Sequence, residues 1–168
     1  TTITSTYTPA TSPSVHATSE SDLELTIHLR PTSTMITCDT PTNFVNEIIT
    51  CTVTVKDEGP APTSAPTGSV TTATSAGANF VLSACTALVA GTGQSTCTFT
   101  YKRTALPGFD AVADTLAAGY GGSTTHSASA GPFAVGISRR TTSFTISACG
   151  TPGTLPTTVT CTATVTDI

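Results

Sequence analysis

The sequence predicts an all-β protein built from antiparallel β-sandwich modules. Three observations support this prediction. Apolar residues alternate with Thr or Ser along many short segments, clusters of Gly, Pro, Asn and Asp separate these segments, and one stretch of sequence occurs twice. Alternation with a period of two residues is typical of strands that bury one face. The repetition indicates that one folding unit recurs along the chain.

The repeated stretch is EIITCTVTVKD at residues 47–57, which matches TTVTCTATVTD at residues 157–167, so that Cys51 and Cys161 stand 110 positions apart. The residues that precede each copy match at the same spacing, with His16 opposite His126 and Arg30 opposite Arg140. A period of about 110 residues is too long for a solenoid unit and is close to the size of one β-sandwich domain. We therefore expect a tandem array of such domains.

This period divides the chain into three parts. Residues 1–30 correspond to the last strands of one module, residues 31–138 form a complete module, and residues 139–168 correspond to the first strands of a following module. Neither terminal part contains enough strands to bury a core alone. Two explanations stay open: a longer protein continues the array, or neighbouring copies complete each other's sheets by strand addition.

Seven strands are expected inside the complete module, at residues 33–38, 47–56, 66–72, 79–85, 94–102, 113–120 and 131–138. Turn clusters separate them in order at residues 39–43, 58–67, 75–77, 91–93, 106–108 and 121–123. The second strand has the clearest pattern, because Thr alternates there with Ile49, Cys51, Val53 and Val55, which places Cys51 on the inward face. No longer stretch has a helical apolar stripe. Seven short strands with regular turns predict an antiparallel sandwich of immunoglobulin type.

Six cysteines occur as three close pairs: Cys38 with Cys51, Cys85 with Cys97, and Cys149 with Cys161. Fifteen disulfide connectivities are formally open to six cysteines. The last pair lies in a partial unit that lacks counterparts of the second pair, so local pairing is the simplest scheme that leaves no cysteine alone. Zinc is the alternative, but its usual close Cys and His spacing is absent. Disulfides indicate an oxidising compartment outside the cytosol.

The run TCDTPTNFVNEIITCTVTVKD, followed by PTGSV, SACTALVAGTGQSTCTFTY and AAGYGGSTTHSASAG, resembles the bacterial immunoglobulin-like repeat domain family. The resemblance covers the complete module and both flanking parts. It implies tandem immunoglobulin-like domains of the kind found in surface and adhesin-type proteins. Gly122 departs from the family pattern, in which an Asp usually stands at this place, so the resemblance implies no acidic group in that turn.

Composition excludes several classes of function. Six basic residues against ten acidic ones, a net charge of −4, give no basic surface for nucleic acid. No apolar run reaches the roughly 20 residues of a membrane helix, so no membrane span is expected. The three histidines are His16, His28 and His126, and two of them occupy equivalent repeat positions, which favours a structural role. We expect no catalytic residues, no metal and no cofactor.

The expected function is therefore that of a non-enzymatic structural protein, extracellular or at the cell surface, whose tandem modules form a filament or an adhesin stalk. The expected partners are copies of the same chain or adjacent modules. The alternative is a binding module that grips carbohydrate or a host surface protein through its loops. Phe109, in the long loop between residues 102 and 114, is the candidate contact for such a ligand, because carbohydrate sites use aromatic platforms.

Overall fold

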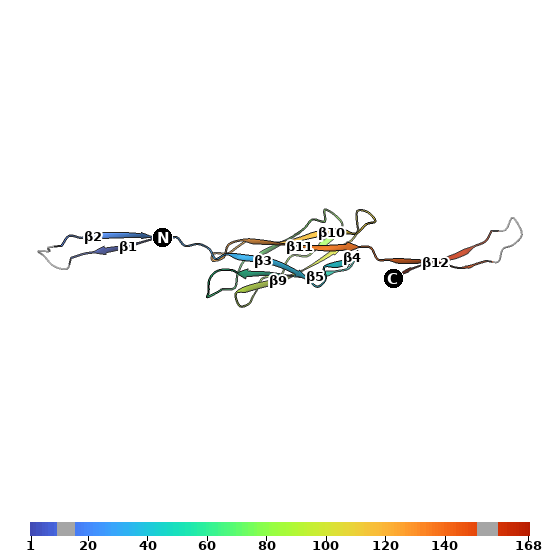
Figure 1. Cartoon of the computed structure of the whole chain (residues 1–168), viewed down its shortest axis with the longest axis horizontal. Helices are drawn as coiled ribbons and strands as arrows, with labels where there is room; N and C mark the ends of the chain where they lie inside the picture. Colours follow the sequence, from blue (N-terminus) through green and yellow to red (C-terminus); the bar gives the residue numbers. More distant parts are fainter. Residues whose placement is uncertain (10–15, 151–157) are drawn as a thin grey trace.

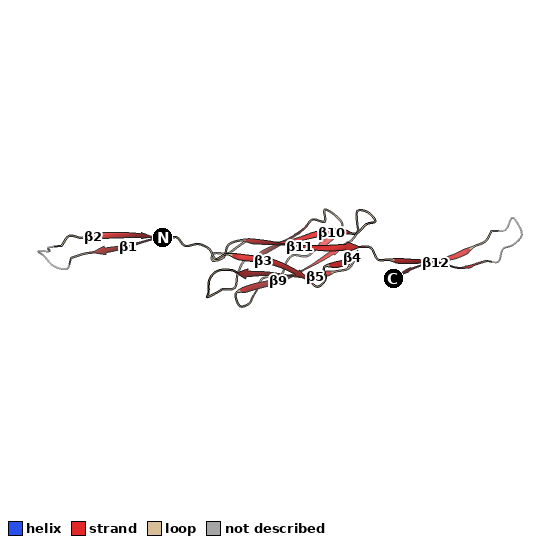
Figure 2. Cartoon of the chain, viewed as in Figure 1, coloured by secondary structure: helices blue, strands red, loops and turns tan. Residues whose placement is uncertain are grey.

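The computed structural model describes residues 1–9, 16–150 and 158–168, and strands are the only regular elements in these ranges. Figure 2 shows a central body of strands with one two-stranded hairpin projecting from each end. The two hairpins point in opposite directions along the long axis (Figure 1). The expectation of an all-β fold with antiparallel sheets is confirmed.

Two sheets form the central body. The first has the order β3-β5-β9-β7, and β8 also pairs with β9; the bounds are β3 (Thr32–Cys38), β5 (Ile49–Asp57), β7 (Phe80–Leu82), β8 (Val89–Ala90) and β9 (Gln94–Arg103). The second has the order β4-β11-β10-β6; the bounds are β4 (Thr42–Phe44), β6 (Val70–Thr74), β10 (Val112–Tyr120) and β11 (Ser129–Ser138). All pairs are antiparallel except β4 with β11.

The core lies between these sheets, where apolar side chains from alternate positions of the strands meet. From the first sheet it contains Ile36, Ile49, Cys51, Val53, Val55, Cys97, Phe99 and Tyr101, and from the second Leu116, Ala118, Tyr120, Val135 and Ile137. Buried and outward-facing residues alternate along β5, as the Thr pattern predicts. Cys51 is fully buried, which confirms its predicted inward position.

A buried cluster of three polar side chains, Tyr101, Arg103 and Asp114, lies at the edge of this core near the start of β10. The hydroxyl of Tyr101 donates to Oδ2 of Asp114 at 2.6 Å, and Nη1 of Arg103 lies 3.5 Å from Oδ1 of the same carboxylate. Burial, together with the hydrogen bond to Asp114, raises the pKa of Tyr101 to about 12. Because the buried carboxylate has both a hydroxyl donor and a guanidinium partner, its burial is compensated.

Three disulfides join the predicted pairs of cysteines. Cys38–Cys51 links directly paired residues of β3 and β5, and Cys149–Cys161 does the same between the strands of the C-terminal hairpin. Cys85–Cys97 differs from these two, because it connects a loop residue after β7 to a residue within β9. Each bond closes a loop of 12 or 13 residues, which limits the freedom of the unfolded chain.

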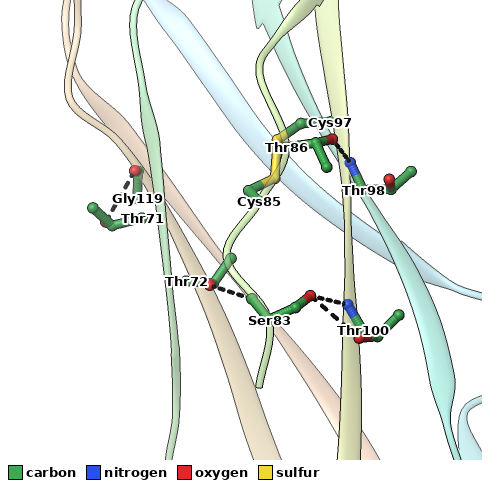
Figure 3. Close-up of a disulfide and its surroundings, with 9 residues drawn as sticks. All are labelled: Thr71, Thr72, Ser83, Cys85, Thr86, Cys97, Thr98, Thr100 and Gly119. Atoms are coloured by element: carbon green, nitrogen blue, oxygen red, sulfur yellow. Dashed lines mark hydrogen bonds between the residues drawn. A yellow bond between two sulfur atoms is a disulfide. The ribbon is translucent and has the colours of Figure 1, made fainter. Parts of the chain in front are cut away.

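Side-chain hydroxyls hold the rest of that segment against β9 (Figure 3). The amide of Thr100 donates to Oγ of Ser83 at 2.7 Å, and the amide of Thr98 donates to Oγ1 of Thr86 at 3.3 Å. Thr72 of the opposite sheet donates to the carbonyl of Ser83 at 3.2 Å. The edge of the first sheet beside β9 therefore consists of two very short strands, β7 and β8, and an irregular segment between them that is hydrogen-bonded to β9. This arrangement protects a sheet edge from pairing with other chains.

The predicted strands differ from the observed ones at four places, one of which is the unpredicted two-residue strand β8. Residues 39–43 were expected as a turn, but Thr42–Phe44 form β4, which pairs in parallel with β11. The third strand begins at Val70 rather than at residue 66, because Gly68 has φ of +121° and interrupts the extended backbone. The predicted strand 79–85 is limited to Phe80–Leu82. Beyond it the amides of Ser83 and Thr86 still donate to carbonyls of β9, but their hydroxyls, rather than carbonyls, accept from the amides of β9.

The terminal hairpins are β1 (Thr2–Tyr7) with β2 (Ser19–Glu24), and β12 (Thr142–Cys149) with β13 (Cys161–Asp167). Thr142 pairs with Asp167 as Thr32 pairs with Asp57, so β12–β13 has the register of β3–β5 moved by 110 residues. A bulge next to Cys149 accommodates its shift of one residue from the position of Cys38.

The first hairpin has the register of β10–β11. Tyr7 pairs with Ser19 as Tyr120 pairs with Ser129, and the strand connection is three residues longer in the first hairpin than in the sandwich. Apart from the bulge at Cys149, the pairing of β1–β2 thus matches that of β10–β11, and the pairing of β12–β13 matches that of β3–β5.

Candidate functional site

The candidate functional site of this chain is the pair of junctions where the hairpins meet the sandwich. At the first junction, Arg30, which precedes β3, forms backbone hydrogen bonds with the loop between β10 and β11. Its amide donates to the carbonyl of Thr125 at 2.9 Å, and its carbonyl accepts from the amide of Ser127 at 2.9 Å. These bonds form an isolated parallel bridge between Arg30 and His126. The entry of the chain into β3 is therefore fixed against the end of the sandwich.

The Arg30 side chain continues this attachment. Its Nε donates to Oδ2 of Asp57 at 2.7 Å, and its Nη2 donates to the carbonyl of Pro60 at 2.7 Å. Asp57, at the end of β5, is 2% exposed and also accepts from the amides of Gly59 and Ser64. Burial alone raises the pKa of a carboxyl, but the hydrogen bonds from Arg30, Ser64 and Gly59 outweigh it and hold the pKa of Asp57 well below its usual range. The Arg30–Asp57 pair is thus ionised.

His126 closes this cluster from the β10–β11 loop and is 1% exposed. Its Nε2 lies 3.6 Å from Oδ2 of Asp57 and 3.2 Å from Oγ of Ser64, while Nδ1 lies 3.0 Å from Oγ1 of Thr125. In a catalytic triad the two ring nitrogens are divided between nucleophile and carboxylate. Here one nitrogen faces both groups and the ring is enclosed, so the arrangement joins three loops rather than activating Ser64.

Replacing Asp57 by Asn is expected to lower the melting temperature by several degrees at neutral pH and to remove part of the acid-side loss of stability. The folded pKa of Asp57 lies below the ordinary value of 3.8. Its ionised form therefore stabilises the fold above about pH 4, and this contribution is lost as the pH falls further. Thermal unfolding followed by circular dichroism between about pH 2 and 7 checks this.

Asp110→Asn is the matched control for this substitution, because Asp110 is exposed in the loop after β9. Its melting curve should run parallel to that of the unmodified chain at every pH. A D57N variant that keeps the full acid-side loss would show that the junction pair does not control stability in acid.

At the second junction, Arg140 bridges the sandwich and the C-terminal hairpin. Its Nη1 donates to Oδ2 of Asp167 at 3.2 Å, its Nη2 forms an ion pair with Glu47, and its guanidinium lies 5.6 Å from the centre of the Phe44 ring. Glu47 and Phe44 belong to the sandwich, whereas Asp167 ends β13. One side chain therefore contacts both bodies.

The two junction arginines stand at corresponding positions beside strand pairs of matching register, and so do their carboxylate partners. Arg30 pairs with Asp57 and Arg140 pairs with Asp167, each residue 110 positions from its counterpart. Sequence comparison matches the two arginines and the two aspartates, but it does not show that they pair, because the pairing depends on how two strands face each other. Each arginine thus forms an ion pair with the last residue of the second strand in the strand pair that follows it.

Phe109, the predicted loop contact, lies at the same end as the second junction and is 90% exposed. Arg139 covers one side of it: the guanidinium lies 5.4 Å from the ring centre, and Nη2 donates to the carbonyl of Gly108 at 2.8 Å. The same loop contributes Pro107 to a hollow of about 470 Å³. The charged residues of this hollow, Arg103 and Asp114, are already bonded to each other.

No protein-family model, curated protein or solved structure matches this chain. The matching registers of its own strand pairs are therefore what its residues can be compared by. Within the described ranges, no group of three or more His, Cys, Asp or Glu side chains is arranged to hold a metal ion. The same ranges contain no helix with the length and apolar character needed to cross a membrane.

Proposed function

We propose that this chain is a non-enzymatic structural protein, made of tandem immunoglobulin-like modules of about 110 residues, that forms a surface filament or an adhesin stalk. Its modules act as stiff spacers whose number sets the length of the fibre. The partners are adjacent modules or further copies of the chain, and the residues at the junctions hold neighbouring modules together.

The strand order supports the immunoglobulin-like assignment. In chain order, β3, β5, β6, β7, β9, β10 and β11 correspond to strands A to G, which gives the sheets ABED and CFG of a constant-type domain. The additional strand β4 lies beside strand G. The resemblance of the sequence to the bacterial repeat family points to the same assignment.

The repeated junction pair is the observation that carries the proposal. Arg30 with Asp57 and Arg140 with Asp167 recur at 110 residues beside strand pairs whose registers agree as far as the bulge at Cys149. Arg140 in addition contacts Glu47 and Phe44 of the unit before it. A residue that closes one module and contacts its predecessor suits an array in which successive modules keep a fixed orientation. The length of such an array increases with the number of its modules, as the length of a stalk must.

The three disulfides indicate an oxidising environment. We place the protein outside the cell or on its surface for this reason. The exposed faces suit this place as well, because Thr and Ser side chains cover much of the strands without a concentration of charge.

A second candidate function is the binding of carbohydrate or a host protein through the loops. The exposure of Phe109 favours it, because an aromatic ring at a loop tip is a suitable platform for a sugar. Arg139 already occupies one side of the ring, however, and the neighbouring hollow has no charged group left unpaired. The structural role therefore remains our first proposal.

Electron microscopy of the native material, combined with peptide mapping under non-reducing conditions, tests the proposed function. We expect long uniform fibres or stalks, and linked peptides that contain Cys38 with Cys51 and Cys85 with Cys97. Discrete compact particles would contradict the filament. Free thiols in the mapped peptides would contradict the extracellular location.

A further inference from the structure

We propose that the N-terminal hairpin of one copy packs face to face against the C-terminal hairpin of a second copy, so that copies join head to tail. This inference rests on the proposed function and deepens it, because it names the partner of each terminal hairpin as another copy of this chain. It concerns the strand pairs β1–β2 and β12–β13.

Each hairpin presents one apolar face to solvent. On β1, β2 and the segment that follows, the exposed fractions are 52% for Ile3, 51% for Tyr7, 63% for Leu23, 45% for Leu25 and 74% for Ile27. On β12 and β13 they are 62% for Phe144, 62% for Ile146 and 65% for Val165. These residues alternate with polar ones, so the other face of each hairpin is hydrophilic. Two unpartnered apolar faces at opposite ends require a cover.

The sandwich shows what covers the equivalent residues. By their pairing registers Ile3 and Tyr7 stand where β10 has Leu116 and Tyr120, and Val165 stands where β5 has Val55; these three sandwich residues are at most 2% exposed. Strands β3 and β11 lie against each other there, in opposite sheets. The strand pairs that match the two hairpins are thus already in contact within this chain.

Polar contacts between those strand pairs have counterparts in the hairpins. In the sandwich, Oγ1 of Thr32 donates to Oγ of Ser129 at 2.8 Å. Thr142 occupies the place of Thr32 on β12, and Ser19 occupies the place of Ser129 on β2. A joint between two copies can therefore re-form this hydroxyl contact at its margin, and the apolar side chains then fill its centre.

One difference shows that the joint is wider than the sandwich. At Gly131 an added Cβ would lie 2.9 Å from the carbonyl carbon of Thr34, so β11 and β3 approach closely there. The first hairpin has Ser21 in place of Gly131, which forbids an equally close approach. The second hairpin has Phe144 in place of Thr34, and this larger side chain occupies the additional space. The two substitutions are complementary, one on each hairpin.

The position of the hairpins makes the contact intermolecular. They project from opposite ends of the sandwich (Figure 1), so they cannot meet within one copy. A contact between two different surfaces does not close on itself in a pair, and its repetition produces an open filament. Each copy then contributes one complete sandwich and half of each of two joints.

Two substitutions on exposed side chains test the joint without touching the core of the sandwich. Leu25→Asp spoils the N-terminal hairpin, and Val165→Asp spoils the C-terminal one. We expect the unmodified 168-residue chain to form concentration-dependent oligomers in sedimentation velocity experiments. Each variant alone should remain monomeric, its dissociation constant raised about tenfold or more by a charge placed in the apolar interface. Val89→Asp, at a residue that is 67% exposed in the sandwich, should associate like the unmodified chain.

Mixing the two variants gives the decisive result. The L25D copy keeps an intact C-terminal hairpin and the V165D copy keeps an intact N-terminal one, so one of each should join and growth should stop at the dimer. A chain that stays monomeric at every concentration, or variants that form longer oligomers alone, would overturn the joint. If purified copies stay apart while the native material still contains filaments, only this inference fails. If the native material contains no filament or stalk, the proposed function itself fails.

Discussion

Replacing both Cys38 and Cys51 by Ala is expected to lower the free energy of unfolding of the sandwich by about 3 kcal/mol. The disulfide closes a loop with a sequence separation of 13 residues, and its removal increases the entropy of the unfolded chain. Cys51 is fully buried between the sheets, so the loss of its sulfur also leaves unfilled space in the core. Urea unfolding followed by tyrosine fluorescence checks the value.

The C-terminal hairpin supplies a matched control for this substitution. Cys149–Cys161 joins the equivalent strands of the C-terminal hairpin, but both of its residues are exposed and lie outside the sandwich. Its replacement by two Ala residues should leave the unfolding of the sandwich unchanged. Equal losses from the two double variants would mean that the hairpin and the sandwich unfold as one unit.

Replacing Gly131 by Ala is expected to destabilise the sandwich by about 1–3 kcal/mol, the usual cost of forcing an additional methyl group into a packed core. The new methyl carbon would meet the carbonyl group of Thr34 in the opposite sheet. Neither backbone can move aside locally, because β11 pairs with β10 along its length and β3 pairs with β5. The sheets must therefore separate at this point, which loosens the core. Thermal and urea unfolding measure the effect.

Gly136→Ala on the same strand is the control for this prediction. An added Cβ there would lie 3.5 Å from Cγ2 of Thr42, an ordinary contact distance. Its stability should stay close to that of the unmodified chain. A Gly131→Ala variant of unchanged stability would show that the two sheets can shift apart freely, and would remove the reason for the wider joint inferred from Ser21.

Much of the fold can be predicted from the sequence because Thr alternates with apolar residues in the long strands. Strands β5, β9, β10 and β11 begin and end within about two residues of their predicted limits, since one face of each is buried and the other is polar. Strand β4 was missed because its three residues follow a cluster of turn formers and obtain their partners from β11, far along the chain. A strand defined by a distant partner leaves no local pattern.

The candidate site could be predicted only in part. The arginines of the two junctions are visible as matching letters at residues 30 and 140. The same spacing matches Asp57 with Asp167 and Glu58 with Ile168, but it does not show that Asp57 is the partner of Arg30. Alternation turns Asp57 inward toward His126 and leaves Glu58 outside with Lys56. The two carboxylates carry the same charge, and the direction of each side chain decides which of them meets the arginine.

The interrupted edge of the first sheet has a consequence for how fibres of this chain would behave when crowded. With β7 and β8 limited to three and two residues, and with Ser83 and Thr86 occupying the amides of β9, a neighbouring strand finds little continuous backbone to pair with along that flank. Lateral bundling is therefore disfavoured there, while the hairpins at the tips keep unpaired strand edges. Fibres of this kind, if formed, are therefore expected not to thicken by strand pairing along that flank.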